Sequence, residues 1–305
     1  MSPARTVLIT GGTGSLGTAT VRALGRRASG WHAVVTGRDR ARTAARAAAL
    51  ADRSGLPVTP LVLNLESLDA VRAFAREWPG RELPPLHAVV CNAGTMVVTG
   101  TRRTADGHEV TFAVNHLAHF LLVELLRPHL VAPARIVMVA SDTHDPARRH
   151  GFPPPRLASV SALAAAPGDG DGTDPREEGR RRYTTSKLCA VLLAYELDRR
   201  LDDPGTTVNA FDPGLMPGTG LARDYHPVFR FAWRYLMPAA TVLPRNVHTT
   251  RTSGAALARL IDDPALDGVS GRYFRGRHEA RSSEQSYDRV AAAELWHGSV
   301  ALTAP

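Results

Sequence analysis

The chain has 305 residues, 44% of them hydrophobic, which suits one large domain or two small ones. Its formal net charge is +8, but apart from the run of three at residues 180–182 the arginines are scattered, so we expect a solvated basic surface and no nucleic-acid partner. The two cysteines, Cys91 and Cys189, fit neither a disulfide framework nor a metal site, and they indicate a reduced, cytoplasmic compartment.

We expect neither a targeting segment nor a stable membrane insertion. The first apolar run begins at Thr6 and is typical of a buried strand, which leaves no room for a signal peptide. No apolar run approaches the length of about 20 residues that spans a bilayer.

Short apolar runs alternate with helical stretches along the chain. The pattern predicts strands at residues 6–10, 32–36, 58–63, 86–91, 134–140, 207–211 and 271–274. It predicts helices at residues 16–28, 40–53, 67–78, 109–130, 183–201, 253–261 and 283–299. This alternation indicates a single α/β domain over residues 1–305, with a doubly wound parallel sheet of about seven strands and helices on both faces.

Two stretches break the alternation. Residues 145–180 contain three successive prolines and a glycine-aspartate repeat, and they predict a surface insertion that is partly disordered. Residues 215–247 mix aromatic, proline and arginine residues and predict a substrate lid. Its apolar side chains could wall a pocket for a bulky substrate, touch a membrane surface or simply pack on the sheet. They are Phe229, Phe231, Trp233, Tyr235, Leu236 and Met237.

A glycine-rich turn lies between the first predicted strand and the first helix. Glycines there let the backbone turn tightly and approach a pyrophosphate at the helix N-terminus. A structural turn without a ligand is the alternative. The residues of this turn expected to contact a dinucleotide are Gly11, Thr13, Gly14, Ser15, Leu16 and Gly17.

The ends of the next two strands predict the cofactor type. Gly37 stands where an NAD-binding fold places a carboxylate, and Arg38 offers a guanidinium for a 2′-phosphate, so we expect NADP(H). Asp39 could still contact the ribose, and Arg38 could be one more surface arginine. After the third strand, Asn64 and Leu65 are candidate adenine contacts, with an ordinary turn as the alternative.

The fourth strand ends in small residues. Asn92, Ala93 and Gly94 would let the adenosine ribose approach the backbone, and Asn92 would tie neighbouring loops together. A turn with asparagine in its usual role is the alternative.

Lys187 is the single lysine among 37 basic residues, and it follows Tyr183 by four positions. On a helix these two side chains share one face. Because an ammonium favours a neighbouring phenolate, we expect Lys187 to lower the pKa of Tyr183 toward the working pH and make it a proton donor. An exposed helix whose lysine survived by chance is the alternative.

These elements, in this order, resemble the short-chain dehydrogenase/reductase family over essentially the whole chain. Three further segments fit the resemblance: residues 114–120 with Asn115, residues 139–141 with Ser141, and the turn of Pro213 and Gly214. Within the family, residues 114–120, 186–189, 213–221, 282–287 and 295–296 are most similar to the retinol dehydrogenase and light-dependent protochlorophyllide reductase branch. The chain departs from the pattern at Ser15, where glycine is usual, and in the 41 residues between Ser141 and Tyr183.

The resemblance implies a Rossmann fold and a set of catalytic roles. Tyr183 would protonate a carbonyl oxygen, and Ser141 would hydrogen-bond the same oxygen. Lys187 would hold the nicotinamide ribose, and Asn115 would position a water that links Lys187 to solvent. Pro213 and Gly214 would shape the nicotinamide pocket. The family often forms homodimers or homotetramers through the helices of Asn115 and Tyr183, which is the expectation for this chain.

The sequence therefore predicts an NADPH-dependent oxidoreductase that interconverts a carbonyl and an alcohol on a lipophilic small molecule. One alternative is reduction of a C=C bond conjugated to a carbonyl or ring. The other is a non-catalytic sensor or scaffold that binds dinucleotide without turnover.

Overall fold

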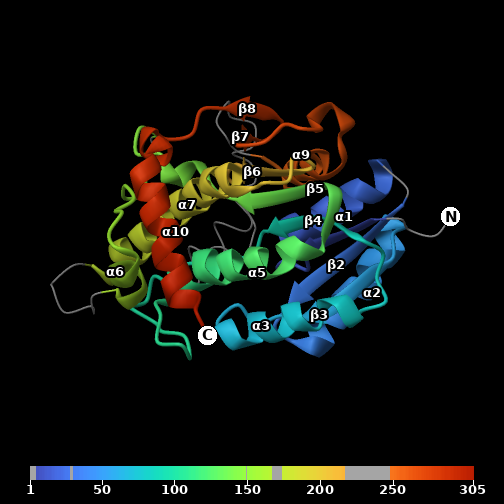
Figure 1. Cartoon of the computed structure of the whole chain (residues 1–305), viewed down its shortest axis with the longest axis horizontal. Coiled ribbons are helices and arrows are strands. Elements are labelled where there is room, and N and C mark those ends of the chain that lie inside the picture. The colour runs from blue at the N-terminus through green and yellow to red at the C-terminus, as the bar shows by residue number, and fades with distance from the viewer. Residues whose placement is uncertain (1–4, 28–29, 149, 167–173, 217–247) are drawn as a thin grey trace.

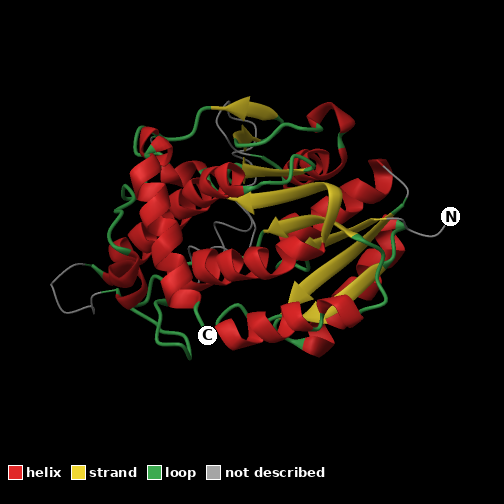
Figure 2. Ribbon diagram, viewed as in Figure 1, coloured by secondary structure: helices red, strands yellow, loops and turns green. Residues whose placement is uncertain are grey.

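The computed structural model describes residues 5–27, 30–148, 150–166, 174–216 and 248–305. One twisted sheet crosses the molecule and helices cover both of its faces (Figure 1). In Figure 2 the strands form a single layer between two layers of helices.

The sheet has eight strands in the order β3-β2-β1-β4-β5-β6-β7-β8. The first seven are parallel, and β8 pairs antiparallel with β7. The strands are β1 (Arg5–Ile9), β2 (Trp31–Gly37), β3 (Val58–Val62), β4 (Leu86–Cys91), β5 (Leu130–Val139), β6 (Thr206–Asp212), β7 (Arg272–Arg275) and β8 (His278–Ala280). Seven of them match the predicted strands to within four residues. The three-residue edge strand β8 is too short for periodicity to reveal.

Two sets of helices pack on opposite faces of the sheet. The helices are α1 (Ser15–Arg27), α2 (Arg40–Ser54), α3 (Leu68–Arg76), α4 (Val110–Phe112), α5 (Ala118–Leu126), α6 (Val160–Ala165), α7 (Pro175–Arg200), α9 (Thr250–Asp262) and α10 (Arg289–Thr303). One core joins α3, α5, α7 and α10 to the sheet, and the other joins α1, α2 and α9. Alternate residues of a strand enter alternate cores: Leu8 packs in the first, while Val7 and Ile9 pack in the second.

Three predicted helices differ from the structure at identifiable points. The helix predicted at 109–130 is α4, a π-helical turn η2 (Ala113–Leu117), α5 and a 3₁₀ turn η3 (Arg127–His129). The helix predicted from residue 283 begins as the 3₁₀ turn η9 (Glu284–Tyr287). Then Asp288 caps α10 by accepting from the backbone N–H of Val290 and Ala291.

The helix of Tyr183 begins eight residues before it, at Pro175. Asp174 caps it, Pro175 occupies the first turn, and Glu177 and Glu178 lie near the positive end of its dipole. The predicted insertion 145–180 therefore contains the start of α7 and all of α6.

Helix α6 packs on the core through Val160 and Ala164, while most of the described residues around it are exposed or partly exposed, as a surface insertion requires. The backbone N–H of Glu109 donates to the carbonyl of Ala164 at 2.7 Å. A Cβ on Gly298 of α10 would lie 2.5 Å from Val160 of α6. Residues 167–173, with the glycine-aspartate repeat, lie outside the described residues.

Helix α10 lies across α7 and α5 and covers the face expected to join subunits (Figure 1). The rings of Phe120 and Trp296 meet edge to face with centroids 5.0 Å apart. His116 Nε2 lies 2.8 Å from Ser299 Oγ. Every residue from 183 to 197 of α7 is buried within the single chain. The prediction of a homodimer or homotetramer through these helices stays a prediction, and α10 covers part of the face that it names.

The predicted lid and membrane contact can be followed only in part. Residues 217–247, with all its aromatic side chains, lie outside the described residues. By length and composition one described stretch, Val110–His129, could cross a bilayer, and most of it is buried inside the protein.

Candidate active site

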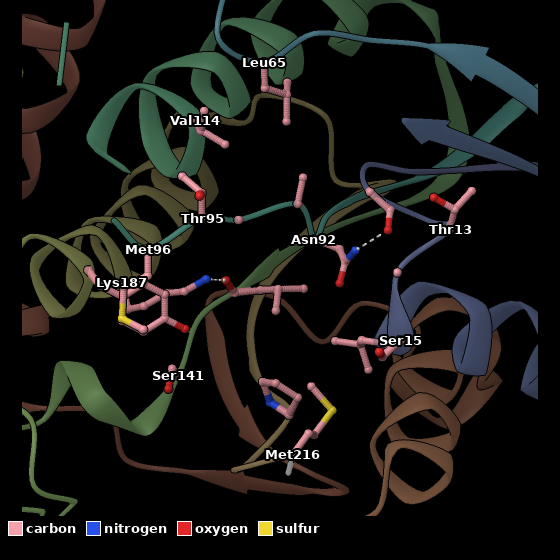
Figure 3. Close-up of a pocket in the computed structure, with 18 of the residues that line it drawn as sticks. Thr13, Ser15, Leu65, Asn92, Thr95, Met96, Val114, Ser141, Lys187 and Met216 are labelled. Carbon is pink, nitrogen blue, oxygen red and sulfur yellow. Dashed lines mark hydrogen bonds between the residues drawn. The ribbon is translucent and has the colours of Figure 1, made fainter. Parts of the chain in front are cut away.

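A cavity of about 740 Å³ opens at the carboxyl ends of the parallel strands. This is where a doubly wound sheet binds ligands, because the chain connections diverge on either side of β1. Figure 3 shows Ser141 and Lys187 on one side of the cavity and Thr13 and Ser15 on the other. Of the predicted site residues, all but Gly17, Asn64 and Asn115 line it.

The glycine turn brings α1 close to β1. Gly11 has φ +59°, and a Cβ there would lie 3.1 Å from Ala93. A Cβ on Gly17 would lie 2.5 Å from the Cα of Gly12, so Gly17 serves the packing of α1 on the turn and not the cavity itself. Ser15 is the first residue of α1 and lines the cavity at the positive end of that helix.

Three arginines line the cavity beyond β2. Arg38, Arg42 and Arg46 follow one another at intervals of four residues, and Arg46 also donates to the carbonyl of Thr13 at 3.2 Å. Arg38 Nη1 pairs with Oε1 of Glu66, which also accepts from Arg102 at 3.0 Å. This end of the cavity therefore carries a positive charge suited to a phosphate, partly neutralised by Glu66.

Two predictions near this end are corrected by the structure. A Cβ on Gly37 would clash with the hydroxyl of Thr43, so packing requires glycine at this position. The glycine also leaves open the space expected for the ribose. Asn64 is exposed and outside the cavity lining, since its Oδ1 accepts from the N–H of Glu66 at 3.1 Å in an ordinary turn. Leu65 lines the cavity as predicted. Asp39 caps α2 by accepting from the N–H of Arg42 at 2.8 Å.

Asn92 ties the end of β4 to the glycine turn, as the sequence predicts. Its Nδ2 donates to the carbonyls of Thr10 at 2.7 Å and Gly11 at 3.3 Å. In return, the Thr10 hydroxyl accepts from the backbone N–H of Asn92 at 2.9 Å and of Ala93 at 3.0 Å. Gly94 lies beside the catalytic pair, since a Cβ there would be 3.8 Å from Lys187 Nζ.

Asn115 lies behind the cavity wall, in the turn η2. Its Oδ1 accepts from the N–H of Thr95 at 2.8 Å, and its Nδ2 donates to the Thr95 carbonyl at 3.0 Å and to Ser186 Oγ at 2.9 Å. These three bonds clamp the segment after β4 onto α7. The water-positioning role of Asn115 stays a prediction.

Ser141 begins a 3₁₀ turn at the end of β5. Its Oγ accepts from the N–H of Thr143 at 3.3 Å and lines the cavity. The buried ring of His144 supports this turn, because its Nδ1 donates to the Ser141 carbonyl at 2.6 Å and its Nε2 accepts from the N–H of Ser283 at 3.0 Å. Burial lowers the pKa of His144, although its bond to the Ser141 carbonyl opposes that shift.

Tyr183 and Lys187 lie together in the cavity, and both are more than nine-tenths buried. Lys187 Nζ lies 5.5 Å from the centre of the Tyr183 ring and donates to the carbonyl of Val139 at 2.9 Å. Burial lowers the pKa of Lys187 to about 8, although the carboxylate of Asp212 opposes that shift.

The predicted direction of the Tyr183 pKa is corrected. Burial raises the pKa of Tyr183, and the negative charges of Asp212 and Asp142 raise it further. Desolvation of the phenolate outweighs the nearby ammonium, so the phenol holds its proton firmly.

Pro213 and Gly214 follow β6 and line the cavity as predicted. Gly214 has φ +74°, and its N–H donates to Asp212 Oδ1 at 2.8 Å. Ser253 of α9 donates to the Pro213 carbonyl at 2.6 Å, which fixes the turn from the far side. Both cysteines are buried free thiols, and the described residues contain no group of histidine, cysteine and acidic side chains able to hold a metal ion.

Comparison with known proteins identifies the arrangement. Residues 5–151 match the sequence model of the short chain dehydrogenases. Protochlorophyllide reductase A, chloroplastic, of Triticum aestivum is 33% identical over 311 residues, which cover 95% of this chain and 78% of that protein. The chain belongs to the short-chain dehydrogenase/reductase family.

Two further comparisons match this short-chain dehydrogenase/reductase over nearly its whole length. Protochlorophyllide reductase of Avena sativa is 33% identical, over 95% of this chain and 96% of that protein. A crystal structure of an uncharacterized protein from Mycobacterium paratuberculosis superimposes with a TM-score of 0.68 at 26% identity, covering 99% and 94% of the two chains. The predicted family and its protochlorophyllide reductase branch are therefore confirmed.

Several site residues were missed in the sequence. The spacing of Arg38, Arg42 and Arg46 would have revealed the arginine row, since positions four apart share a helix face. Glu66, His144 and the buried His119 have no such signal, because their partners lie far away in the chain.

Proposed function

We propose that this oxidoreductase uses NADPH to reduce a carbonyl group on a lipophilic small molecule, or to oxidise the corresponding alcohol. The observation that carries the proposal is that Ser141, Tyr183 and Lys187 line the same cavity as the glycine turn. A carbonyl that gains a hydride becomes an alkoxide, and this cavity offers preplaced donors for it.

The residues at the other end of the cavity fit a dinucleotide phosphate. The turn at Gly11 has no room for a side chain, and α1 begins at Ser15 directly beside it. Arg38, Arg42 and Arg46 would surround a 2′-phosphate. The bound nicotinamide would supply the hydride.

The protein's own groups would manage the proton. Because the pKa of Tyr183 is raised, its phenol is protonated at neutral pH and can donate to the carbonyl oxygen. Ser141 would donate a second hydrogen bond to the same oxygen. Lys187 is charged below its pKa of about 8, and its ammonium would stabilise the phenolate that remains on Tyr183.

The second candidate is reduction of a C=C bond, which the similarity to protochlorophyllide reductases favours. There Tyr183 would protonate carbon, and a donor to oxygen such as Ser141 would act only where the C=C bond is conjugated to a carbonyl. Ser141 at the cavity wall therefore favours the carbonyl reaction. A sensor or scaffold would need none of Asn115, Ser141, Tyr183 and Lys187, so the complete set argues against that alternative.

The test measures NADPH consumption by the purified protein with lipophilic ketones, aldehydes, enones and protochlorophyllide, and identifies the product by mass spectrometry and NMR. Formation of an alcohol that requires both Tyr183 and Ser141 supports the proposal. A saturated C=C product that survives Ser141→Ala would replace it with the second candidate. NADPH binding without any turnover would support the alternative of a non-catalytic sensor or scaffold. We also propose a cytoplasmic location, which the two buried free thiols support because thiols persist in a reducing compartment.

A further inference from the structure

The segment between Ser141 and Tyr183 brings an aromatic ring to the proton donor. The ring centroids of Phe152 and Tyr183 are 6.2 Å apart with an interplanar angle of 44°. Phe152 packs with Tyr183, Met96 and Val98 in a small apolar cluster separate from the two cores. Phe152 and Met96 also line the cavity, so they would contact a substrate bound beside the Tyr183 phenol.

Phe152 is held in place on several sides. The guanidinium of Arg180 lies over its ring at 4.8 Å from the centroid. Its backbone N–H donates to His150 Nδ1 at 3.1 Å, and the two rings are 6.0 Å apart. Because His150 Nδ1 accepts, its Nε2 carries the proton and donates to the Asp145 carbonyl at 3.2 Å.

The next residues tie this segment to α7 beside Tyr183. Thr184 Oγ1 lies 3.1 Å from the carbonyl of Pro153, and Arg181 donates to the carbonyl of Pro154 at 3.3 Å. The aromatic ring is therefore positioned by the same helix as the proton donor, which keeps their separation constant.

We propose that Phe152 and Met96 form a wall that selects substrates whose carbonyl is attached directly to a planar aromatic ring. The proposal deepens the proposed function and rests on it for the reacting group. A flat ring stacks against Phe152 while its carbonyl reaches Tyr183 and Ser141. An aromatic pair contributes about 0.5–1.5 kcal/mol beyond burial, or roughly 2- to 12-fold in affinity.

The test compares acetylnaphthalene with acetyldecalin, which has a similar size but a saturated ring system. Dissociation constants are measured by titration calorimetry with the NADP⁺-loaded protein. We expect the wild type to prefer the aromatic ketone. Phe152→Leu keeps an apolar side chain but removes the ring, so the preference should fall by roughly 2- to 12-fold, while Phe152→Tyr should restore it. Tyr287→Leu, which removes a ring elsewhere, serves as the control.

An unchanged preference in Phe152→Leu, or a wild type that binds neither ketone, overturns the proposal. If the preference depends on Phe152 but the protein oxidises no NADPH with either ketone, the proposed wall is supported and the proposed carbonyl reaction is contradicted.

Discussion

The hydroxyl of Thr10, at the end of β1, lies 2.9 Å from Nε2 of His119 on α5. The hydroxyl oxygen already accepts from the N–H groups of Asn92 and Ala93, so its proton points to His119 or to the Val90 carbonyl at 3.3 Å. His119 Nδ1 in turn donates to the backbone carbonyl of Asn115 at 3.3 Å. One buried histidine thus connects the cofactor turn with the turn that holds Asn115.

Thr10→Val should destabilise the protein by about 2–4 kcal/mol, because it keeps the shape but leaves the Ala93 N–H and a buried ring nitrogen of His119 without their partner, while the Asn92 N–H keeps only the Val90 carbonyl. NADPH affinity should fall as well, since Asn92 and Ala93 line the cavity. Thr10→Ser keeps the hydroxyl and is the matched control. Urea unfolding and NADPH titration measure both effects, and equal stability of the two variants would contradict the role of this hydroxyl.

Acid should destabilise the fold through two buried histidines. Burial lowers the pKa of His116 to about 3 and of His119 to about 4, against 6.5 for the exposed side chain. Between about pH 6.5 and 4, protons bind both side chains in the unfolded chain but not in the native one. The free energy of unfolding should therefore fall with falling pH by about 1.4 kcal/mol per unit for each histidine.

Urea unfolding between about pH 7 and 4.5 measures this slope. His116→Gln should remove the contribution of one proton to this slope and leave the contribution of His119. His129 is partly exposed on the surface, so His129→Gln should leave the slope as in the wild type. A slope unaffected by His116→Gln would show that the native state takes up that proton.

NADPH binding should weaken as the pH rises through about 8. The pKa of Lys187 is lowered to about 8, so above this pH its amine is neutral and no longer attracts the cofactor. Titration of NADPH at several pH values measures the affinity of the free protein. In Lys187→Arg, whose charge persists at high pH, the loss should disappear. A wild-type affinity that stays constant up to about pH 10 contradicts the assignment.

Glu66 should weaken the preference for NADPH. Its carboxylate already pairs with Arg38 and would repel a 2′-phosphate, so Glu66→Gln should strengthen NADPH binding by about 3- to 10-fold and leave NADH unchanged. Arg38→Ala should weaken NADPH far more than NADH. Glu77→Gln breaks a similar surface pair with Arg81 away from the cavity and serves as the control. Equal changes for both cofactors would refute the 2′-phosphate role.

The protein should be a monomer in solution. Helix α10 covers parts of α5 and α7 that were expected to join subunits, and residues 183–197 are all buried within the chain. Size-exclusion chromatography with light scattering should give the mass of one chain. Leu125→Arg, on the part of α5 that remains exposed, should not change that mass. A dimer that dissociates in Leu125→Arg would contradict the expectation.

Local sequence signals were enough to predict the sheet and most of the cavity. The strands are short apolar runs that end in glycine, asparagine or serine, and each signal lies within a few residues of the structure that it specifies. The pair Tyr183 and Lys187 is recognisable for the same reason, because one helix sets their spacing.

The rest depends on contacts between distant parts of the chain. Phe152 meets Tyr183 because Thr184 and Arg181 of α7 bond to the carbonyls of the residues that follow Phe152. The raised pKa of Tyr183 reflects its burial and the charge of Asp212, neither of which local spacing encodes. Gly37 packs against Thr43 on the following helix, where a side chain would clash. In the sequence, this packing requirement cannot be told from the glycine that a cofactor site needs.

The burial of Lys187 in the middle of α7 also makes the chain report on its own unfolding. A protease that cuts only after lysine has a single site in the whole sequence, and that site is buried in the native fold. The chain can be cut there only when α7 leaves the core, so the rate of appearance of two fragments measures how often the protein opens. The fragments would separate the cofactor-binding half from the rest of the sheet with one cut.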